Sequence, residues 1–442
     1  MGEPSGSPAG LLELRGRMCG VRILLWHGYL LGGTGSNVYT RQLAREWSRA
    51  GHDITVLSQE PQPEAYDLGG SATVRPDVGG FLPVFVLDRY EGYDDVRRLP
   101  DCTRAELERW VEANAAAVRE LLPADLVFTN HVLLGGPVGV ASGAPFAVKA
   151  HGSELEYSMR GRPDLGAWGA ETLAEARATF VGSGHIRRVV EEVCGHTEPV
   201  FEVPPGVDVE LWQPEGRDAA LAELLSEAAL DRGNPGNAEE RLPDHGNEDR
   251  LRAFLAGDQP TVVYFGKLIE QKGVDVLLRA LRGVDARVVV VGFGPERQAL
   301  EALAASTGVR ALFTGPLEHR HLRHLLAFAD ACVVPSVFPE AFGMVAAEAA
   351  AAGCPPVVSR HSGLAEVAAG LEEALPAGLE RLVSFPTGDA GALRERLTTL
   401  IALAEDDRAL LRGTVRRVVE ERWSWAGIAR RLLELARQEG GG

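Results

Sequence analysis

A pair of lysines five residues apart is the first candidate for chemistry in this 442-residue chain. Lysine and arginine together number 45, yet lysine occurs only at Lys149, Lys267 and Lys272. A lysine ammonium is a compact point charge that the planar arginine fork does not replace. Lys267 follows an apolar run and Lys272 precedes a helical pattern, so both would lie near a helix start. Free amides and ammonium groups there bind anions, and the spacing favours a diphosphate site over two solvated surface lysines.

Two glutamates eight positions apart form the second candidate. Glu340 and Glu348 flank AFGMVAA, and the alanine-rich pattern predicts a helix over 341–352. Eight residues are close to a whole number of helical turns, so both carboxylates would face one side. A carboxylate accepts two hydroxyl hydrogen bonds, which suits the vicinal hydroxyls of a sugar or a ribose. On spacing alone, two solvated glutamates are the alternative.

Glycine-rich turns and one histidine also follow predicted strands. Gly33 and Gly35 lie in GGTG after the first strand, and Gly292 and Gly294 lie in a similar turn of the second half. Such turns let the backbone approach a phosphate, although neither is a full GxGxxG and each could be only a tight turn. His151 follows the strand FAVKA. Catalytic side chains gather at the carboxyl ends of parallel strands; a hydrogen-bonded structural histidine is the alternative.

Composition and charge narrow the class of protein. Hydrophobic residues make up 45% and charged residues 24%, as in ordinary folded chains. The net charge of −17 argues against a nucleic-acid partner. No apolar run reaches the roughly 18 residues that span a bilayer, and the start of the chain lacks the pattern of a signal peptide. Five scattered cysteines without a CxxC pair fit a reducing compartment, so we expect a cytoplasmic protein.

Two further clusters are expected to have surface or structural roles. The histidine cluster consists of His319, His321 and His324. No cysteine or carboxylate pair completes a metal shell around it. An arginine stripe on a predicted helix consists of Arg41, Arg45 and Arg49. Such a stripe is typical of a solvated helix face, so we expect neither a metal site nor membrane contact.

Short apolar runs alternate with helical patterns along most of the chain. VRILLW, ITVLS, DLVFTN, FAVKA and ATFVGS indicate strands in the first half. TVVYFGK, RVVVVGFG, ALFTG, ACVVPS and PPVVSR indicate strands in the second half. This alternation predicts an α/β fold with parallel sheets, arranged as two doubly wound Rossmann-like domains that face each other across a cleft.

The predicted domain borders follow changes in composition. Residues 1–20 form a flexible N-terminus, 21–205 a first domain and 206–418 a second domain. Residues 214–258 are acidic and poor in aromatics, which predicts a surface insertion that is partly helical and partly disordered. Residues 419–442 contain a C-terminal helix, expected from about 421 to 438, with Trp423 on its apolar side.

Taken in chain order, the motifs resemble those of one enzyme family. They are GGTGSNVY, KAHGSE, VPPGVD, YFGKLIEQKG, VVVVGFGPE, FTGPL and VVPSVFPEAFGMVAAEAAAAGCPPVVS. Over residues 21–440 the chain resembles the retaining glycosyltransferases of family 4, also called glycosyltransferase group 1, which have the GT-B fold. The segment 334–358 with its two glutamates is the most specific match, whereas the insertion is longer than usual in that family.

The resemblance implies a role for each candidate residue. The expected catalytic residues are His151 beside the anomeric carbon, Glu340 on the donor sugar, and Lys267 and Lys272 on the donor diphosphate. The expected donor-binding residues are Gly33, Gly35, Gly292, Gly294, Leu317, Phe342, Gly343, Met344 and Glu348. The residues expected on the acceptor side are Asn37, Arg41 and Glu154.

Within this set, the second-domain residues are expected to bind different parts of the donor. Residues 292–295 and 316–317 would wall the base, and Glu348 would hold the ribose hydroxyls. Gly33 and Gly35 would close over the diphosphate from the first domain, and the C-terminal helix would cross back to that domain.

The implied reaction needs no metal ion and no other cofactor. Fixed ammonium groups and helix-start amides would stabilise the leaving diphosphate of a UDP- or GDP-sugar. The acceptor hydroxyl would attack on the face from which the diphosphate leaves, and the diphosphate would take its proton. The acceptor is a small molecule, a glycan or a lipid-linked sugar; its identity and the oligomeric state stay open.

Other functions remain as alternatives. A nucleotide-sugar epimerase or a phosphorylase of GT-B-like fold is one, but a phosphorylase needs a pyridoxal-phosphate lysine, for which Lys149 is the one spare candidate. A non-catalytic nucleotide-sugar-binding protein is another, although both lysines and both glutamates of the motif are intact. A dinucleotide-binding dehydrogenase is a further alternative. Such an enzyme needs an acidic residue after its glycine-rich turn in a βαβ unit, and no acidic residue fits that position in the sequence.

Overall fold

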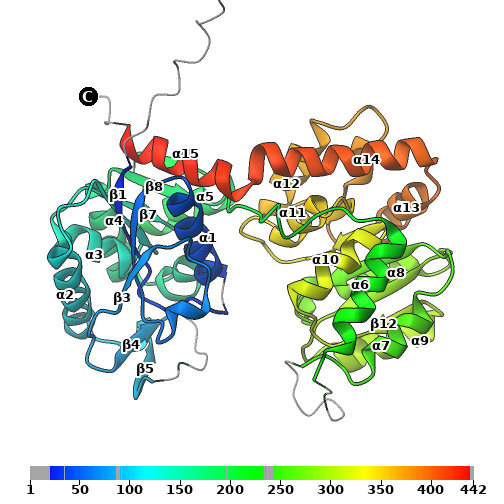
Figure 1. Ribbon diagram of the computed structural model, residues 1–442, viewed down its shortest axis with the longest axis horizontal. Coiled ribbons are helices and arrows are strands. Elements are labelled where there is room, and N and C mark those ends of the chain that lie inside the picture. The colour runs from blue at the N-terminus through cyan, green and yellow to red at the C-terminus, as the bar shows by residue number, and fades with distance from the viewer. Residues whose placement is uncertain are drawn as a thin grey trace, which may run out of the picture. The chain divides into compact units, whose positions relative to one another are not determined.

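The structure is a computed structural model that describes residues 20–33, 35–85, 90, 92–195, 198–232, 234 and 242–438 (Figure 1). Most of the N-terminus that we expect to be flexible, residues 1–19, lies outside these ranges. The chain divides into two compact units, 1–148 and 149–442, and the border falls within strand β7 (Phe146–Lys149).

A seven-stranded sheet contains the strands predicted in the first half. Its strand order is β3 (Ala72–Val74), β2 (Asp53–Leu57), β1 (Arg22–Trp26), β6 (Leu126–Asn130), β7, β8 (Ala178–Val181) and β9 (Val200–Glu202). The strand pairs β1–β2, β1–β6, β2–β3 and β8–β9 are parallel. Strands such as β6 are buried along their whole length, which explains why β6 begins with an apolar run and lacks polar–apolar alternation.

Helices connect these strands, as the alternation predicts. They are α1 (Gly35–Arg49), α2 (Arg104–Glu120), α3 (Gly135–Ser142), α4 (Pro163–Glu175) and α5 (Gly184–Cys194). A separate two-stranded pair, β4 (Phe81–Val84) and β5 (Asp95–Arg98), precedes α2. A capping box starts α2, in which the Thr103 side chain accepts from the Glu106 N–H and the Glu106 carboxylate accepts from the Thr103 N–H.

A second, six-stranded parallel sheet contains the strands predicted in the second half. Its strand order is β12 (Arg310–Phe313), β11 (Arg287–Val291), β10 (Thr261–Phe265), β13 (Ala331–Val334), β14 (Pro356–Ser359) and β15 (Ser384–Phe385). The predicted fold class, α/β with two Rossmann-like parallel sheets, is confirmed. The carboxyl ends of β10, β11, β12 and β13 lead into the loops that carry the predicted donor-binding residues.

Ten helices of the described ranges follow the first sheet in the chain. They are α6 (Arg217–Ala229), α7 (Asn247–Phe254), α8 (Val274–Leu281), α9 (Arg297–Thr307), α10 (His319–Phe328), α11 (Met344–Ala351), α12 (Ser362–Glu372), α13 (Ala390–Ile401), α14 (Glu405–Val418) and α15 (Trp425–Arg437). Two of them, α6 and α7, lie in the segment 214–258. Within the described ranges, no helix combines the length and hydropathy that crossing a bilayer requires.

The helix predicted over 341–352 starts later in the structure. α11 spans Met344–Ala351, and Gly343 before it has a φ of +109°, outside the helical region. A Cβ at Gly343 would lie 2.6 Å from Leu364 Cδ2, so the backbone bends where it packs against α12. The predicted start of this helix, at residue 341, is therefore wrong: residues 341–343 belong to the loop that carries Glu340, and of the two glutamates only Glu348 lies in the helix.

The predicted C-terminal helix is interrupted. Val419–Trp423 form one π-helical turn, and α15 starts only at Trp425. The Val207 N–H donates to the Trp423 carbonyl at 2.7 Å, and the Trp425 N–H donates to the Val207 carbonyl at 3.2 Å. Trp423, expected on the apolar side of the last helix, packs edge-on against Phe342 with ring centroids 5.6 Å apart. The pairing with Val207 explains why the helix does not run through.

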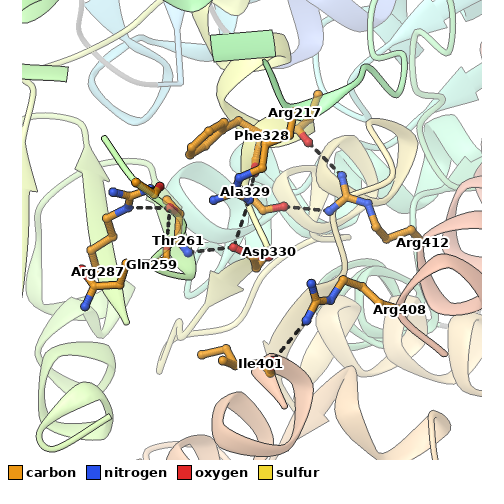
Figure 2. A network of polar contacts seen from close by, with 12 residues as sticks. Arg217, Gln259, Thr261, Arg287, Phe328, Ala329, Asp330, Ile401, Arg408 and Arg412 are labelled. Carbon is orange, nitrogen blue, oxygen red and sulfur yellow. Dashed lines mark hydrogen bonds and ion pairs between the residues drawn. The ribbon is translucent and has the colours of Figure 1, made fainter. Parts of the chain in front are cut away.

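A buried arginine organises the amino ends of strands in the second sheet (Figure 2). Arg287 opens β11 and is completely buried. Its Nε donates to Thr261 Oγ1 at 2.8 Å, and its Nη atoms donate to the carbonyls of Phe254, Ala256 and Gly257 at 2.8, 2.8 and 3.2 Å. Burial lowers the pKa of Arg287 to about 10, and these carbonyls compensate the buried charge.

Asp330 extends the network to the neighbouring strands. Its Oδ2 accepts from the Thr261 N–H at 2.8 Å and from Arg217 Nη1 at 3.3 Å. Arg412 on α14 donates to the Ala329 carbonyl at 2.8 Å. Figure 2 shows these side chains converging beside the starts of β10, β11 and β13. The amino ends of the second sheet are thus held together by charged groups that bind backbone.

We predict that Arg287→Ala lowers the free energy of unfolding by about 2–4 kcal/mol, because it leaves several buried carbonyls without a donor. Chemical denaturation followed by tryptophan fluorescence measures this change. Arg282→Ala removes an exposed arginine of the same unit and is the matched control, with an expected change below about 0.5 kcal/mol. Equal changes in the two variants would contradict the structural role of Arg287.

Candidate functional site

The loops that follow β10 and β11 approach each other so closely that only glycine fits. The Leu268 N–H donates to the Phe293 carbonyl at 2.7 Å, and the Gly292 N–H donates to the Gly315 carbonyl at 2.9 Å. A Cβ at Gly292 would lie 1.8 Å from the carbonyl oxygen of Gly266. Three loops at the carboxyl ends of β10, β11 and β12 are therefore tied together through their backbones.

Gly294 and Leu317 lie in the same group of loops. A Cβ at Gly294 would lie 2.3 Å from the Leu268 carbonyl oxygen, and Leu317 is buried. The Glu296 N–H donates to that same carbonyl at 3.0 Å. The residues predicted to wall the base, 292–295 and 316–317, therefore belong to neighbouring, interlocked loops.

The two lysines lie on the loop between β10 and α8. Lys267 is exposed, and the Tyr264 hydroxyl donates to its carbonyl at 2.8 Å. Lys272 ends a 3₁₀ turn, Glu270–Lys272, and forms an ion pair with Glu340. A Cβ at Gly273, whose φ is +61°, would lie 2.2 Å from the Pro335 carbonyl oxygen. This contact brings the lysine loop against the loop that carries the glutamate.

The Glu340 loop is held from both sides by residues that follow β14. The Glu340 N–H donates to Ser362 Oγ at 2.8 Å, and the Gly363 N–H donates to the Glu340 carbonyl at 3.0 Å. His361 lies 2.9 Å from Ser362 Oγ through Nδ1 and 2.7 Å from the Ser336 carbonyl through Nε2. Ser362 has a φ of +46°, a strained value for a residue with a side chain.

The backbone bends at the start of α11, and the second glutamate of the motif, Glu348, lies within this helix. Phe342 and Gly343 are buried and Met344, the first residue of α11, is half-buried. Glu348 lies within α11, and burial raises its pKa to about 8. At neutral pH this carboxyl is therefore mostly protonated when no ligand is bound.

His151 follows β7 in a loop stabilised by two buried charged residues. The His151 N–H donates to Glu154 Oε1 at 2.8 Å, and the Glu154 side chain is completely buried. Lys149 is also buried, and its Nζ donates to the Val203 carbonyl at 2.8 Å. Burial lowers the pKa of Lys149 to about 7. The His151 side chain is half-buried.

The remaining candidates lie in the unit 1–148. Gly33 is exposed with a φ of +93°, and Gly35 starts α1. Asn37 is buried, with Oδ1 2.7 Å from His27 Nε2 and with Nδ2 donating to the Gly32 carbonyl. The Arg41 guanidinium lies 4.8 Å from the centroid of the Tyr66 ring.

Several residues beside these candidates have no counterpart in the sequence-based prediction. His27 and His131 directly follow β1 and β6, with ring centroids 6.0 Å apart. Burial and the neighbouring His131 lower the pKa of His27 to about 3, and His131 has a φ of +73°. The strand-end rule that selects His151 also selects this pair. Nothing in the local pattern points to His361 and Ser362, which follow β14.

The clusters assigned to surface or structural roles lie beside acidic side chains. His321 Nε2 lies 2.9 Å from Asp231 Oδ1, and His324 Nδ1 lies 2.7 Å from Glu215 Oε2. In the arginine stripe, Arg45 pairs with a glutamate on its own helix. Among the described residues, no group of three or more histidines, cysteines and carboxylates has the arrangement that could hold a metal ion.

Two family models match this chain. The model described as "Glycosyl transferases group 1" matches residues 247–412, and the model described as "Glycosyltransferase Family 4" matches residues 33–211. The first match contains both lysines and both glutamates of the candidate site. The second contains the glycine turn and His151.

Similar proteins are found among curated relatives. A GDP-mannose-dependent alpha-(1-6)-phosphatidylinositol monomannoside mannosyltransferase from Mycolicibacterium smegmatis is 31% identical over 321 residues, covering 68% of this chain and 72% of that protein. A D-inositol 3-phosphate glycosyltransferase from Xylanimonas cellulosilytica is 29% identical over 370 residues, covering 75% and 77%. An uncharacterized glycosyltransferase from Methanocaldococcus jannaschii is 40% identical over 116 residues, 25% of this chain and 30% of that protein.

Solved structures share the fold at lower identity. Anabaena HepE in complex with UDP and glucose has a TM-score of 0.66 and 16% identity, and the match covers 95% of this chain and 100% of that chain. At this identity the similarity concerns the fold alone.

The raised pKa of Glu348 generates a prediction on ligand binding. If ribose hydroxyls donate to this carboxylate, they favour its ionised form, so nucleoside diphosphate affinity increases as pH rises from 7 to about 8 and levels off above that. The gain cannot exceed about tenfold per pH unit for one proton. Calorimetric titration across this range measures it.

Glu348→Gln is the control for this prediction, because it keeps the shape but does not titrate. The variant retains any pH dependence that the ligand phosphates contribute. The difference between the two pH profiles therefore isolates the carboxyl, and superimposable profiles would refute a role of Glu348 in binding the ribose.

Proposed function

We propose that this chain, which belongs to the GT-B glycosyltransferases that combine a group 1 region with a family 4 region, transfers a sugar from a nucleotide-sugar donor to an acceptor hydroxyl. The transfer would proceed with retention of the anomeric configuration and without a metal ion. The observation that carries this proposal is the ion pair between Lys272 and Glu340 at the carboxyl ends of the second sheet. It supports the proposal, because the lysine would bind the diphosphate while the carboxylate beside it would accept hydrogen bonds from the sugar hydroxyls.

The leaving group determines what the lysines do. When the bond between the anomeric carbon and the phosphate oxygen breaks, negative charge grows on the diphosphate. The ammonium groups of Lys267 and Lys272, on one short loop, would stabilise that charge more in the transition state than in the ground state. The amides at the start of α11 would add backbone donors to the same end of the site.

The two acids would hold the two polyols of the donor. Glu340 lies in a loop fixed by Ser362 and Gly363, so its carboxylate can accept from sugar hydroxyls at a defined position. Glu348 would accept from the ribose, and its ionisation would accompany that binding. His151, in a loop held by Glu154, would lie beside the anomeric carbon.

Retention follows from attack on the face that the leaving group vacates. The acceptor oxygen forms a bond with the anomeric carbon as the phosphate oxygen leaves. The proton of the acceptor hydroxyl passes to that phosphate oxygen, so the products are the glycoside and the protonated nucleoside diphosphate. No separate base is needed, because the departing diphosphate gains basicity as it leaves.

The relatives suggest where to look for substrates. One is named for GDP-mannose and a phosphatidylinositol mannoside, and another for D-inositol 3-phosphate. A direct test screens UDP- and GDP-sugars with inositol phosphates and phosphatidylinositol as acceptors, following nucleoside diphosphate release. Proton NMR of the product then gives the anomeric configuration; inversion, or release without a glycoside product, would refute the proposal.

We also propose the domain division at 205/206 and the role of the C-terminal helix. The continuation of the first sheet to β9 supports a border after that strand. The backbone pairing of Val207 with Trp423 and Trp425, and the packing of α15 beside β8, support a second crossing of the chain near its end. A variant truncated before α15 should lose activity while its second sheet stays folded.

Loss of either lysine should impair catalysis more than folding. We predict that Lys267→Ala and Lys272→Ala each cost about 2–4 kcal/mol of transition-state stabilisation, seen as a fall in kcat/KM. Initial rates across donor concentrations measure it. Arg279→Ala, an exposed cation on α8, is the matched control and should keep kcat/KM within about twofold. Near-wild-type kcat/KM in both lysine variants would refute the assignment.

Metal independence is a separate prediction. Two lysines and backbone amides would supply the charge that a divalent ion supplies in metal-dependent transferases. Rates should therefore be the same after dialysis against EDTA and after addition of Mg²⁺ or Mn²⁺. Loss of activity in EDTA with recovery on adding either ion would overturn the assignment of the diphosphate to the lysines.

A further inference from the structure

The end of the insertion lies against the edge strand of the second sheet. Residues 242–250 include the start of α7, and Figure 1 labels α7 beside β12 and α9. β12 is the outer strand of its sheet. The sequence pattern assigns no function to this segment.

Three donors of this segment bind the backbone where β12 ends. The Asp244 N–H and Asn247 Nδ2 both donate to the Thr314 carbonyl at 2.9 Å. Arg250 Nη2 donates to the Phe313 carbonyl at 2.6 Å. The segment is thus attached at the carboxyl end of the strand, directly before residues 315–317.

Asp244 also reaches the neighbouring loop. Its two carboxylate oxygens accept from Arg297 Nη1 at 2.9 Å and Nη2 at 2.6 Å, which is a bidentate pair. The Asp244 side chain is only 10% exposed. Arg297 is the first residue of α9, and its N–H donates to the Gly294 carbonyl at 3.2 Å. Asp244 therefore joins the two loops: its carboxylate binds Arg297 after β11, and its N–H binds the Thr314 carbonyl after β12.

Gly315 shows how closely the carboxylate approaches the second loop. A Cβ at this glycine, whose φ is +69°, would lie 2.8 Å from Asp244 Oδ1. Its carbonyl accepts the Gly292 N–H at 2.9 Å. Asp244 therefore lies against the loop after β12, and that loop is hydrogen-bonded to the loop after β11.

We infer that Asp244, paired with Arg297, is a positioning residue for recognition of the nucleotide base: it fixes residues 292–295 and 315–317, whose backbone groups select the base. This role deepens the proposed function and rests on it. A base read by backbone groups is discriminated only if those groups are held in place before binding. The insertion supplies that support from outside the wall.

A simpler role for the segment is to cover the open edge of β12. The hydrogen bonds to Thr314 and Phe313 alone would serve that purpose. The half-buried bidentate pair with Arg297 goes further, because it connects the segment to the loop of the adjacent strand, β11. The two roles differ in what the loss of Asp244 does to base selection.

The test measures binding of UDP, GDP, ADP and inorganic pyrophosphate to the full chain by competition and calorimetry. Pyrophosphate probes the lysines without a base. We expect Asp244→Ala to lower the affinity for the preferred nucleoside diphosphate at least tenfold and to reduce the difference in affinity between it and the other two nucleoside diphosphates. The affinity for pyrophosphate should change by less than twofold. Asp244→Asn, which keeps the volume but not the charge, should show a smaller change of the same kind.

Arg252→Ala is the matched control, because Arg252 lies on α7 and forms its ion pair with Glu248 of the same helix. It should change none of the four affinities. Arg297→Lys, which keeps the charge but cannot form the bidentate pair, should reproduce the narrowing of base preference.

Each other outcome overturns the inference. The inference fails, while the proposed function stands, if Asp244→Ala lowers only thermal stability and leaves the order of nucleoside diphosphate affinities unchanged. It fails in the same way if the variant loses as much affinity for pyrophosphate as for nucleoside diphosphates. In both cases the segment only covers the edge of β12. If the unchanged chain binds no nucleoside diphosphate, the proposed function and the inference fail together. If Asp244→Ala does not fold, the base ranking of Asp244→Asn and Arg297→Lys decides.

Discussion

The ion pair between Lys272 and Glu340 is the contact on which the candidate site depends. The two side chains are 32% and 22% exposed, and such pairs contribute only about 0–1 kcal/mol to stability. Their importance is positional. Gly273 allows the lysine loop to pass the Pro335 carbonyl, and Ser362 holds the backbone of the glutamate. In the proposed reaction the cation and the anion would each exchange their partner for a different part of the donor.

The charged groups that bind backbone and the candidate functional residues lie at opposite ends of the second sheet. At the amino ends, Arg287 and Asp330 bind backbone groups of several strands and keep them in register. At the carboxyl ends, glycine-rich loops carry the candidate residues and leave their side chains partly exposed. This arrangement is physically reasonable, because a rigid sheet can position loops whose sequences provide functional residues rather than core packing.

The preference for one nucleotide base over another can be set by loops, without a change in the strands of the sheet. One relative is named for GDP-mannose, and a structure of the same fold holds UDP, so related frameworks accommodate different bases. The loops after β11 and β12 are the parts that can differ without disturbing the strands. In this chain the half-buried Asp244 connects those two loops to the segment 242–250. This segment thereby contacts the part of the proposed site where specificity would reside.

Patterns along the chain were enough to predict the two parallel α/β sheets, the strand-end loops and the charged residues in them. Hydrophobic periodicity and the strand-end rule are local, so they can be read without coordinates. They could not place the start of α11, because the bend at Gly343 depends on packing against Leu364. Nor could they find Ser362 or Asp244, whose hydrogen bonds reach partners 22 and 53 positions away. Contacts of that kind exist only after strands distant in sequence pair side by side, since the pairing brings their loops to one edge.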